Sequence, residues 1–349
     1  MLGWDTFVSS YILTPQTPDE IKADPRIRGW GGPGTDIEKP ADIVTLRIMD
    51  DVVLDPASGL AADNYRMDNM GADIRRARAA GQVVLYDIDD DIWNIPLWSP
   101  ASRAMHKLIA ARAVDLSVVN ANIEACDGVV TPTKYLADEL RLRFPKVPVY
   151  VLAPGIDSAP YDAVRSLPPP RQNYVGWMGS ISHHLLHLRS IEPALDCLPA
   201  HGADFVRLGY IEGDRSELLL AELPCNVRQI PWGGVDELPV KLAGLDVGII
   251  PRVAERFHEG QSITSGLQYA AAGVPFIASA TAEYVELMKL GVGHIADSVT
   301  SWRRQLTWLL SAEPSWRRGY AREARDIALK EYGLDATARR YDDLFSSLI

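Results

Sequence analysis

Hydrophobic positions along the chain form short runs of β-branched and aliphatic residues, and longer amphipathic stretches separate these runs. In the first half, the pattern predicts strands at 42–49, 82–88, 128–133 and 148–154, and helices at 69–81, 99–126 and 134–144. The strands are apolar at successive positions, which is typical of strands buried on both faces of a parallel sheet. Gly81 follows the first helix at a position where glycine favours a helix end.

The second half repeats this alternation more regularly. Its predicted strands lie at 174–180, 204–210, 226–232, 246–251, 274–279 and 292–297. The predicted helices between them lie at 186–198, 214–222, 235–243, 262–272 and 281–290, and the pattern after residue 300 is helical to the end. Strands that alternate with helices predict an α/β fold with doubly wound parallel sheets.

The stretch 158–173 contains three consecutive prolines and fits neither a helix nor a central strand. A chain of 349 residues is also longer than one typical hydrophobic core. We therefore predict two Rossmann-like domains, at 1–165 and 166–330, joined by a linker in this stretch. Ligands of such folds bind beyond the carboxyl ends of the strands, so we expect a site in the cleft between the domains.

Composition narrows the class of protein. The formal net charge of −11 disfavours binding of phosphate backbones by bulk electrostatics, although a local basic groove stays compatible with it. Cys126, Cys197 and Cys225 form no Cys-x-x-Cys pair, so we expect a reducing compartment and no disulfide framework. The first residues have no basic segment ahead of an apolar run, and no stretch of about 18 apolar residues occurs. The sequence thus predicts a cytoplasmic protein without a membrane span.

The loop after the strand at 174–180 contains Gly179, which permits close approach of the backbone to a ligand. A helix begins soon afterwards, and amides at a helix N-terminus favour phosphate. His183, His184 and His187 have a spacing that metal ligands can have, but no carboxylate or thiol is close in sequence to complete a zinc site. A histidine that binds phosphate is the better interpretation, with a solvated helix start as the alternative.

The loop after the strand at 246–251 carries Arg252 and Arg256 and leads into a helix with Ser262 as its expected N-cap. A helix N-terminus beside two arginines is typical of an anion site. Gln268 lies six residues beyond Ser262. That is about 9 Å along a helix axis and roughly the separation of a diphosphate from the sugar of a nucleotide. An amphipathic helix behind a solvated loop is the alternative.

The segment "VVLYDIDDDIW" at 83–93 places four carboxylates behind an apolar run, at Asp87, Asp89, Asp90 and Asp91. Taken alone, this cluster is compatible with a metal site, an acid/base pair or a polar loop at the end of a strand. Trp93 lies next to it and offers a stacking surface.

Four segments resemble retaining glycosyltransferases of the GT-B fold, especially family 4 and its bacterial and bacteriophage members. They are "VVLYDIDDDIWNIP", "VLAPGID", "VGWMGSISHHLLHL" and "SGLQYAAAGVPFIAS", in the order of that family between about residues 80 and 300. The resemblance implies transfer of a hexosyl or pentosyl unit from a nucleotide sugar, such as a UDP- or GDP-sugar, with no obligatory cofactor. It also implies that the second domain holds the nucleotide, the first presents the acceptor, and the helix at 331–349 packs back toward the first domain.

With this resemblance, we predict that amides and cations hold the diphosphate and that the leaving phosphate takes the proton of the acceptor. The residues predicted at the diphosphate are Gly179, Ser180, His184, Gln261, Ser262 and Ser265, with Arg252 and Arg256 as catalytic cations. Gln268 is predicted at the ribose. The residues predicted on the acceptor side are Asp89, Asp90, Asp91 and Trp93, so no metal is expected there. His106 is predicted either to assist at the acceptor or to be a polar residue on a helix face.

Two departures from the family pattern keep other interpretations open. Relatives have Glu at the position of Gln268, and often Lys near Gln261 or Ser265. A glutamine keeps one acceptor oxygen but loses the charge, so a non-catalytic nucleotide-sugar-binding or scaffolding protein is an alternative. A nucleotide-sugar epimerase and a transferase that modifies a hydroxylated DNA base are the others. The class of acceptor therefore stays open among a glycan, a protein and a modified DNA base. If the protein is encoded by a phage, the expected location is the cytoplasm of the host.

Overall fold

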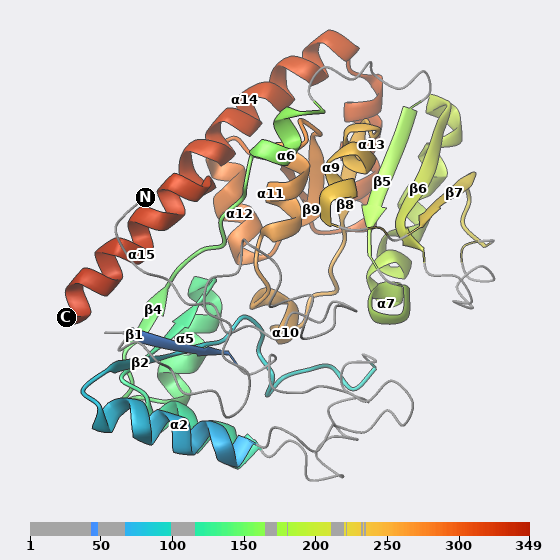
Figure 1. The fold of residues 1–349 in the computed structure, drawn as a ribbon. Helices are drawn as coiled ribbons and strands as arrows, with labels where there is room; N and C mark the ends of the chain where they lie inside the picture. The colour runs from blue at the N-terminus through green and yellow to red at the C-terminus, as the bar shows by residue number, and fades with distance from the viewer. Residues whose placement is uncertain are drawn as a thin grey trace.

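The computed structural model describes residues 43–47, 67–98, 116–164, 173–179, 181–210, 220, 222–231, 233 and 235–349. Two separate parallel sheets carry the fold, each with its own helices (Figure 1). We call the sheet β1–β4 with its helices the first unit, and the sheet β5–β10 with its helices the second unit. His106 and Ser180 lie outside the described residues.

The first unit has four parallel strands in the order β1-β2-β3-β4. They are β1 (Ile43–Arg47), β2 (Val83–Asp87), β3 (Gly128–Thr131) and β4 (Val149–Val151), with helices α2 (Met67–Ala79), α4 (Leu116–Ala125) and α5 (Lys134–Arg143). Every residue of β3 is buried, as expected for an apolar strand covered on both faces. Gly81 has a φ of 80° just after α2, a conformation that glycine adopts without strain.

The second unit has six parallel strands in the order β10-β9-β8-β5-β6-β7. They are β5 (Asn173–Met178), β6 (Ala203–Tyr210), β7 (Val227–Pro231), β8 (Val247–Ile250), β9 (Phe276–Ser279) and β10 (His294–Ala296). The chain builds outward from β5 to β7 and then crosses to the other side of β5 with β8. The strand order therefore reverses between β5 and β8, and such a switch point is where doubly wound folds bind ligands.

Helices on both faces of the second sheet give it two buried clusters, one around Tyr269 and Phe276 and the other around Val175 and Trp302. The helical segments after β5 and β7 are α7 (Ile181–Ile191), η2 (Glu192–Cys197), η3 (Pro199–His201), η4 (Val235–Glu237) and α9 (Leu238–Ala243). Those after β8 are α10 (Arg256–Glu259), α11 (Thr264–Ala271), α12 (Ala282–Lys289), α13 (Val299–Ser311) and α14 (Pro314–Tyr332).

The chain crosses between the units twice, and the two crossings lie side by side. After β4 it passes through α6 (Ala159–Asp162), and the Ile156 amide donates to the Tyr332 carbonyl at 2.8 Å. The last helix, α15 (Leu334–Leu348), then runs back along the molecule toward the first sheet (Figure 1). Its Leu344 packs against Leu85 and Val130 of that sheet. The α/β fold with two parallel sheets and a returning C-terminal helix is confirmed.

Some predicted boundaries were wrong. The helix predicted at 186–198 begins earlier, at Ile181, and continues after Ile191 as the 3-10 segment η2, which has Pro193 in its first turn. The helix predicted from residue 262 begins at Thr264, so its N-cap is Ile263 and not Ser262. The predicted linker contains the short helix α6. The helix predicted at 214–222 lies almost entirely outside the described residues.

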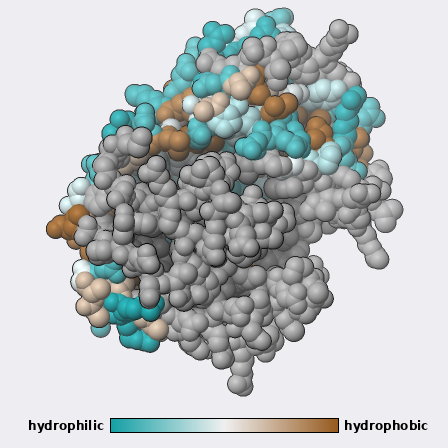
Figure 2. Space-filling model, in the orientation of Figure 1, coloured by the Kyte–Doolittle hydropathy of each residue, from teal (hydrophilic) through white to brown (hydrophobic). Residues whose placement is uncertain are grey.

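No helix among the described residues is both long enough and apolar enough to cross a membrane. On the face drawn in Figure 2, the hydrophobic side chains of the described residues form small patches between hydrophilic ones.

Candidate functional site

The loop between β8 and α11, residues 251–263, lies at the switch point of the second sheet. Arg252 organises it from within. Its guanidinium donates to the carbonyls of Gln261 at 3.1 Å and Ser262 at 2.8 Å. Its backbone amide donates to Ser279 Oγ at 2.8 Å, and that hydroxyl donates back to the Arg252 carbonyl at 3.0 Å. These bonds give Arg252 a role in shaping the loop.

Helix α11 begins at this loop with an uncapped N-terminus. Ile263 occupies the N-cap position and provides no side-chain hydrogen bond. Among the described residues, none accepts a hydrogen bond from the amides of Thr264 and Ser265. The third amide, of Gly266, donates to the Tyr284 hydroxyl at 3.3 Å. Two adjacent free amides at the positive end of a helix are suited to an anion.

Two contacts fix the direction in which this N-terminus points. The Tyr269 hydroxyl donates to the Gly176 carbonyl at 2.9 Å, which ties α11 to β5. A Cβ on Gly266 would lie 2.7 Å from a ring carbon of Tyr284 and 3.0 Å from one of Phe276, so only glycine allows this packing. The sequence "SGLQY" therefore sets α11 close against the sheet and leaves its first turn facing the loop.

The other residues predicted for the donor are distributed around this turn. The Ser262 hydroxyl lies 2.9 Å from that of Thr264, and Gln268 lies half-buried on α11. Gly179 follows β5, but its own amide donates to the Leu208 carbonyl at 3.1 Å. Arg256 is exposed at the start of α10. The backbone of His184 lies in α7, while its side chain is not among those described.

The sequence singled out His187 as a possible metal or phosphate ligand, but it did not predict that this side chain pairs with His258. The rings of His187 and His258 lie 4.3 Å apart, and Trp98 of the first unit packs against both. Burial lowers the pKa of His258, so its imidazole is neutral at neutral pH. The Trp98 indole donates to both carboxylate oxygens of Glu255, at 3.0 and 3.2 Å. Nothing in the sequence signals this contact, because it joins residues 157 positions apart.

The acidic loop after β2 contributes mainly to the architecture of the first unit. Asp91 is buried, and its carboxylate accepts from the Asn94 side chain at 2.7 Å. Trp93 donates to Asn120 Oδ1 at 3.0 Å and packs its ring against Phe144. Asp89 and Asp90 are half-buried and make further interactions.

The N-terminus of α5, at the carboxyl end of β3, is fully occupied by groups of the protein. Thr133 caps the helix by accepting from the Leu136 amide at 3.2 Å, and its hydroxyl donates to the Gly260 carbonyl at 3.0 Å. Glu283 of α12 accepts from the Lys134 amide at 2.8 Å. Burial raises the pKa of Glu283, while the Lys134 and Tyr135 amides lower it in turn. This helix end therefore joins the first unit to the second.

A metal centre gains no support from the geometry of the described residues. No group of three or more histidine, cysteine or acidic side chains among them is arranged to hold a metal ion. Within the histidine cluster considered for zinc, His187 instead accepts from the Val253 amide through Nδ1 at 3.0 Å.

Solved structures of other proteins share this architecture. A variant of S. aureus TarM in complex with Fondaparinux, alpha-GlcNAc-glycerol and UDP is 10% identical, with a TM-score of 0.54 over 76% of this chain and 51% of that chain. The present chain thus spans about half the length of TarM. Anabaena HepE in complex with UDP is 12% identical, with a TM-score of 0.56 over 81% of this chain and 77% of that one. TarM and HepE are GT-B glycosyltransferases. The chain has the GT-B fold.

The GT-B fold alone does not decide the activity. The N-terminal domain of a Candida albicans trehalose-6-phosphate phosphatase is 14% identical, with a TM-score of 0.58 over 90% of this chain and 72% of that one. No protein-family model matches the chain, and no curated protein does.

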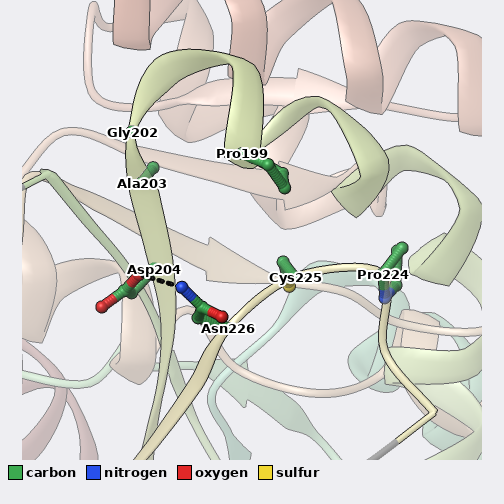
Figure 3. A pocket seen from close by; sticks show the side chains of 7 residues that line it. All are labelled: Pro199, Gly202, Ala203, Asp204, Pro224, Cys225 and Asn226. Carbon is green, nitrogen blue, oxygen red and sulfur yellow. Dashed lines mark hydrogen bonds between the residues drawn. The ribbon is translucent and has the colours of Figure 1, made fainter.

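A surface pocket lies elsewhere in the GT-B fold (Figure 3). Its lining residues are Pro199, Gly202, Ala203, Asp204, Pro224, Cys225 and Asn226. Figure 3 shows Asp204 and Asn226 directed toward each other, joined by a hydrogen bond of 3.3 Å. Ala203 begins β6 and Asn226 precedes β7, so the pocket lies at the amino ends of these strands, opposite the edge where such folds bind ligands.

Proposed function

We propose that the protein is a glycosyltransferase that moves a sugar from a nucleotide-diphosphate-sugar to an acceptor. The observation that carries the proposal is the uncapped N-terminus of α11 at the switch point of a GT-B fold. Two amides, of Thr264 and Ser265, have no acceptor within the part of the chain that the structure describes, and they form a proposed binding position for an anion such as a diphosphate. The complexes of TarM and HepE with UDP support a uridine nucleotide as the first donor to test.

In this proposal the second unit holds the donor. The first turn of α11 and the side chains of Gln261, Ser262 and Ser265 bind the diphosphate, and the exposed Arg256 supplies a positive charge. Gly179 follows β5, and Ser180 and His184 are proposed as further contacts of the diphosphate. Gln268, one turn further along α11, binds the ribose. Arg252 supports these groups by holding the loop that presents them.

The reaction is proposed to proceed with retention and without a metal. Fixed amides and cations stabilise the departing nucleoside diphosphate, as in other preorganised electrostatic sites. The leaving phosphate accepts the proton of the acceptor hydroxyl, so no protein base is needed. Proton NMR of the product's anomeric centre tests retention, and transfer that stops with EDTA would contradict the metal-independent mechanism.

The first unit is proposed to present the acceptor through the half-buried Asp89 and Asp90, with Trp93 and His106 as further candidates, while the buried Asp91 supports their loop through its bond from Asn94. The class of acceptor is open among a glycan, a protein and a modified DNA base. Asp89→Ala tests the assignment, because loss of transfer with unchanged donor hydrolysis indicates an acceptor contact. A loss of both that is reversed by added metal would instead place a metal at the acidic loop.

The decisive experiment incubates the full chain with UDP-, GDP- and TDP-sugars and scores hydrolysis and nucleotide affinity. We expect one donor to be hydrolysed, and Arg256→Ala to slow that turnover while the unfolding temperature stays unchanged. Gln268→Glu should change nucleotide affinity, because it restores a charged acceptor at the ribose. Binding of a donor without hydrolysis or transfer would identify a non-catalytic binding protein, and binding of no donor would contradict the proposal.

A further inference from the structure

Trp98 connects the first unit to the loop 251–263 of the second unit. Its indole donates to Glu255 at 3.0 and 3.2 Å, so both carboxylate oxygens take part. Its ring packs against His187 and His258, with centroid distances of 5.5 and 5.7 Å. Glu255, His187 and His258 thus all contact the half-buried side chain of Trp98. The position of Trp98 and the position of the loop therefore depend on each other.

The two histidines that pack against Trp98 also contact residues near both ends of the loop. His187 and His258 are only 2% and 3% exposed. His187 Nδ1 accepts from the Val253 amide at 3.0 Å, immediately after Arg252. His258 Nδ1 lies 3.3 Å from Gln261 Oε1, just before the turn into α11. Each imidazole thus holds one end of the loop, and both pack against Trp98.

We propose that Trp98 is a positioning residue for nucleotide binding by the second unit. It fixes the histidine pair and Glu255, and these fix the loop that presents the first turn of α11. Trp98 itself touches no part of the donor in this arrangement. The inference rests on the proposed function, since it assigns to the first unit a part in binding a donor held by the second.

The test measures UDP affinity by calorimetry on the full chain. Trp98→Phe keeps a ring but removes the donor to a carboxylate, a hydrogen bond strong enough to change the affinity by about 10-fold. Trp98→Ala also removes the ring contacts and should weaken binding further. Trp316→Phe is the matched control, because that indole is 43% exposed on α14 and stacks on Tyr320 far along the chain from the loop.

A double-mutant cycle shows whether the effect passes through Glu255. Glu255→Ala should weaken UDP binding about as much as Trp98→Phe, and the double variant should be no weaker than either, because both remove one interaction. Glu255→Gln keeps an acceptor oxygen and should bind nearly as well as the wild type. By NMR, the lowered pKa of His258 should rise in Trp98→Ala, which uncovers the ring, and stay unchanged in Trp316→Phe.

The outcomes separate the inference from the proposed function. Wild-type protein that binds UDP, with Trp98→Phe and Trp98→Ala binding equally well, would overturn the inference and leave the proposed function intact. Strictly additive losses in the cycle would also overturn it. Wild-type protein that binds no nucleotide would remove both. Should Trp98→Ala fail to fold, Trp98→Phe and Glu255→Ala still decide the question.

Discussion

Two helix N-termini at the carboxyl ends of parallel strands differ in what occupies them. The amides that begin α5 are taken by Thr133 and by Glu283, which comes from the other unit. The amides of Thr264 and Ser265 that begin α11 have no acceptor among the described residues. Both helices offer the same partial positive charge. The N-terminus of α5 forms a contact between the two units, which we call the α5 joint. The N-terminus of α11 is available to an external anion.

The same structural element, a helix N-terminus beyond a parallel sheet, thus has a structural role in the first unit and a proposed binding role in the second. An orphan amide at a helix start has to be satisfied by a side chain, water or a ligand. At α5 a buried threonine and a carboxylate do this permanently, so that site holds the two units together. At α11 the cap position is Ile263, whose side chain has no hydrogen-bonding group.

A carboxylate introduced into the first turn of α11 should compete with an external anion for its amides, so that α11 becomes occupied by the protein as α5 is. In Ser265→Asp, a carboxylate in the first turn repels a diphosphate, and we expect nucleotide affinity to fall by more than about 100-fold, or ~2.7 kcal/mol. The same carboxylate interacts favourably with the helix dipole by about 0.3–1 kcal/mol, so the unfolding temperature should stay constant or rise. Calorimetry and thermal unfolding measure the two effects. Ser265→Asn, similar in size without the charge, is the control, and unchanged affinity in the Asp variant would place the donor elsewhere.

Removing Arg252 should disorganise the loop that keeps α11 open. Arg252→Ala leaves the Gln261 and Ser262 carbonyls without their charged donor, and we expect a loss of stability of about 1.5–3 kcal/mol together with loss of nucleotide binding. Arg252→Lys should restore little, because an ammonium lacks the planar fork that reaches both carbonyls. Chemical denaturation measures the change in stability, and Arg256→Ala is the control for stability alone, because Arg256 is exposed and its loss should leave the folded structure unchanged. A variant of full stability that binds no nucleotide would show that Arg252 contacts the diphosphate directly.

The sheets were predictable from sequence because burial on both faces leaves a local signal. Strands β3 and β8 consist of Gly, Val and Ile, with Thr131 as the single polar residue, and all their residues are buried. Because the strands could be located, the loops that follow them could be located as well. The segment that contains Arg252 and Gln268 was predicted in this way. The polar composition of that loop suggested Ser262 as the cap, but the chain continues through Ile263 before the helix starts. The Ser262 carbonyl accepts from Arg252, a contact between loop residues that the sequence does not show.

Contacts between the units could not be predicted. The bond from Trp98 to Glu255 joins residues 157 positions apart, and that from Lys134 to Glu283 spans 149. Neither pair has a local pattern, because each depends on how two separately folded sheets are placed. Likewise, sequence identifies Arg252 as a cation near a helix start, but it does not show that carbonyls of the same loop use its donors.

Removing the Glu283 carboxylate from the N-terminus of α5 should weaken the contact between the two units at the α5 joint. Glu283→Ala leaves the Lys134 and Tyr135 amides without their carboxylate, and we expect a loss of about 1–2 kcal/mol. Glu283→Gln keeps an acceptor oxygen, and burial disfavours the wild-type charge, so its cost should be only a few tenths of a kcal/mol. Urea denaturation curves compare the two variants. Equal losses in both would mean that the charge, and not the hydrogen bond, makes the joint.

The pH dependence of this joint should be small and of a definite sign. Burial raises the pKa of Glu283 above its ordinary value of 4.5, so the folded protein binds this proton more tightly than the unfolded chain. The stability that this group contributes is therefore fully present below the unfolded pKa and is lost as the pH rises through the folded pKa. Relative to Glu283→Gln, the wild type should gain stability as the pH is lowered from about 7 toward 4.5, by tenths of a kcal/mol because part of the side chain stays in contact with solvent. Denaturation midpoints of both proteins across this range measure the difference. A gain in the opposite direction would show that the α5 amides outweigh burial, and that the occupied N-terminus prefers a full charge just as the open one is proposed to do.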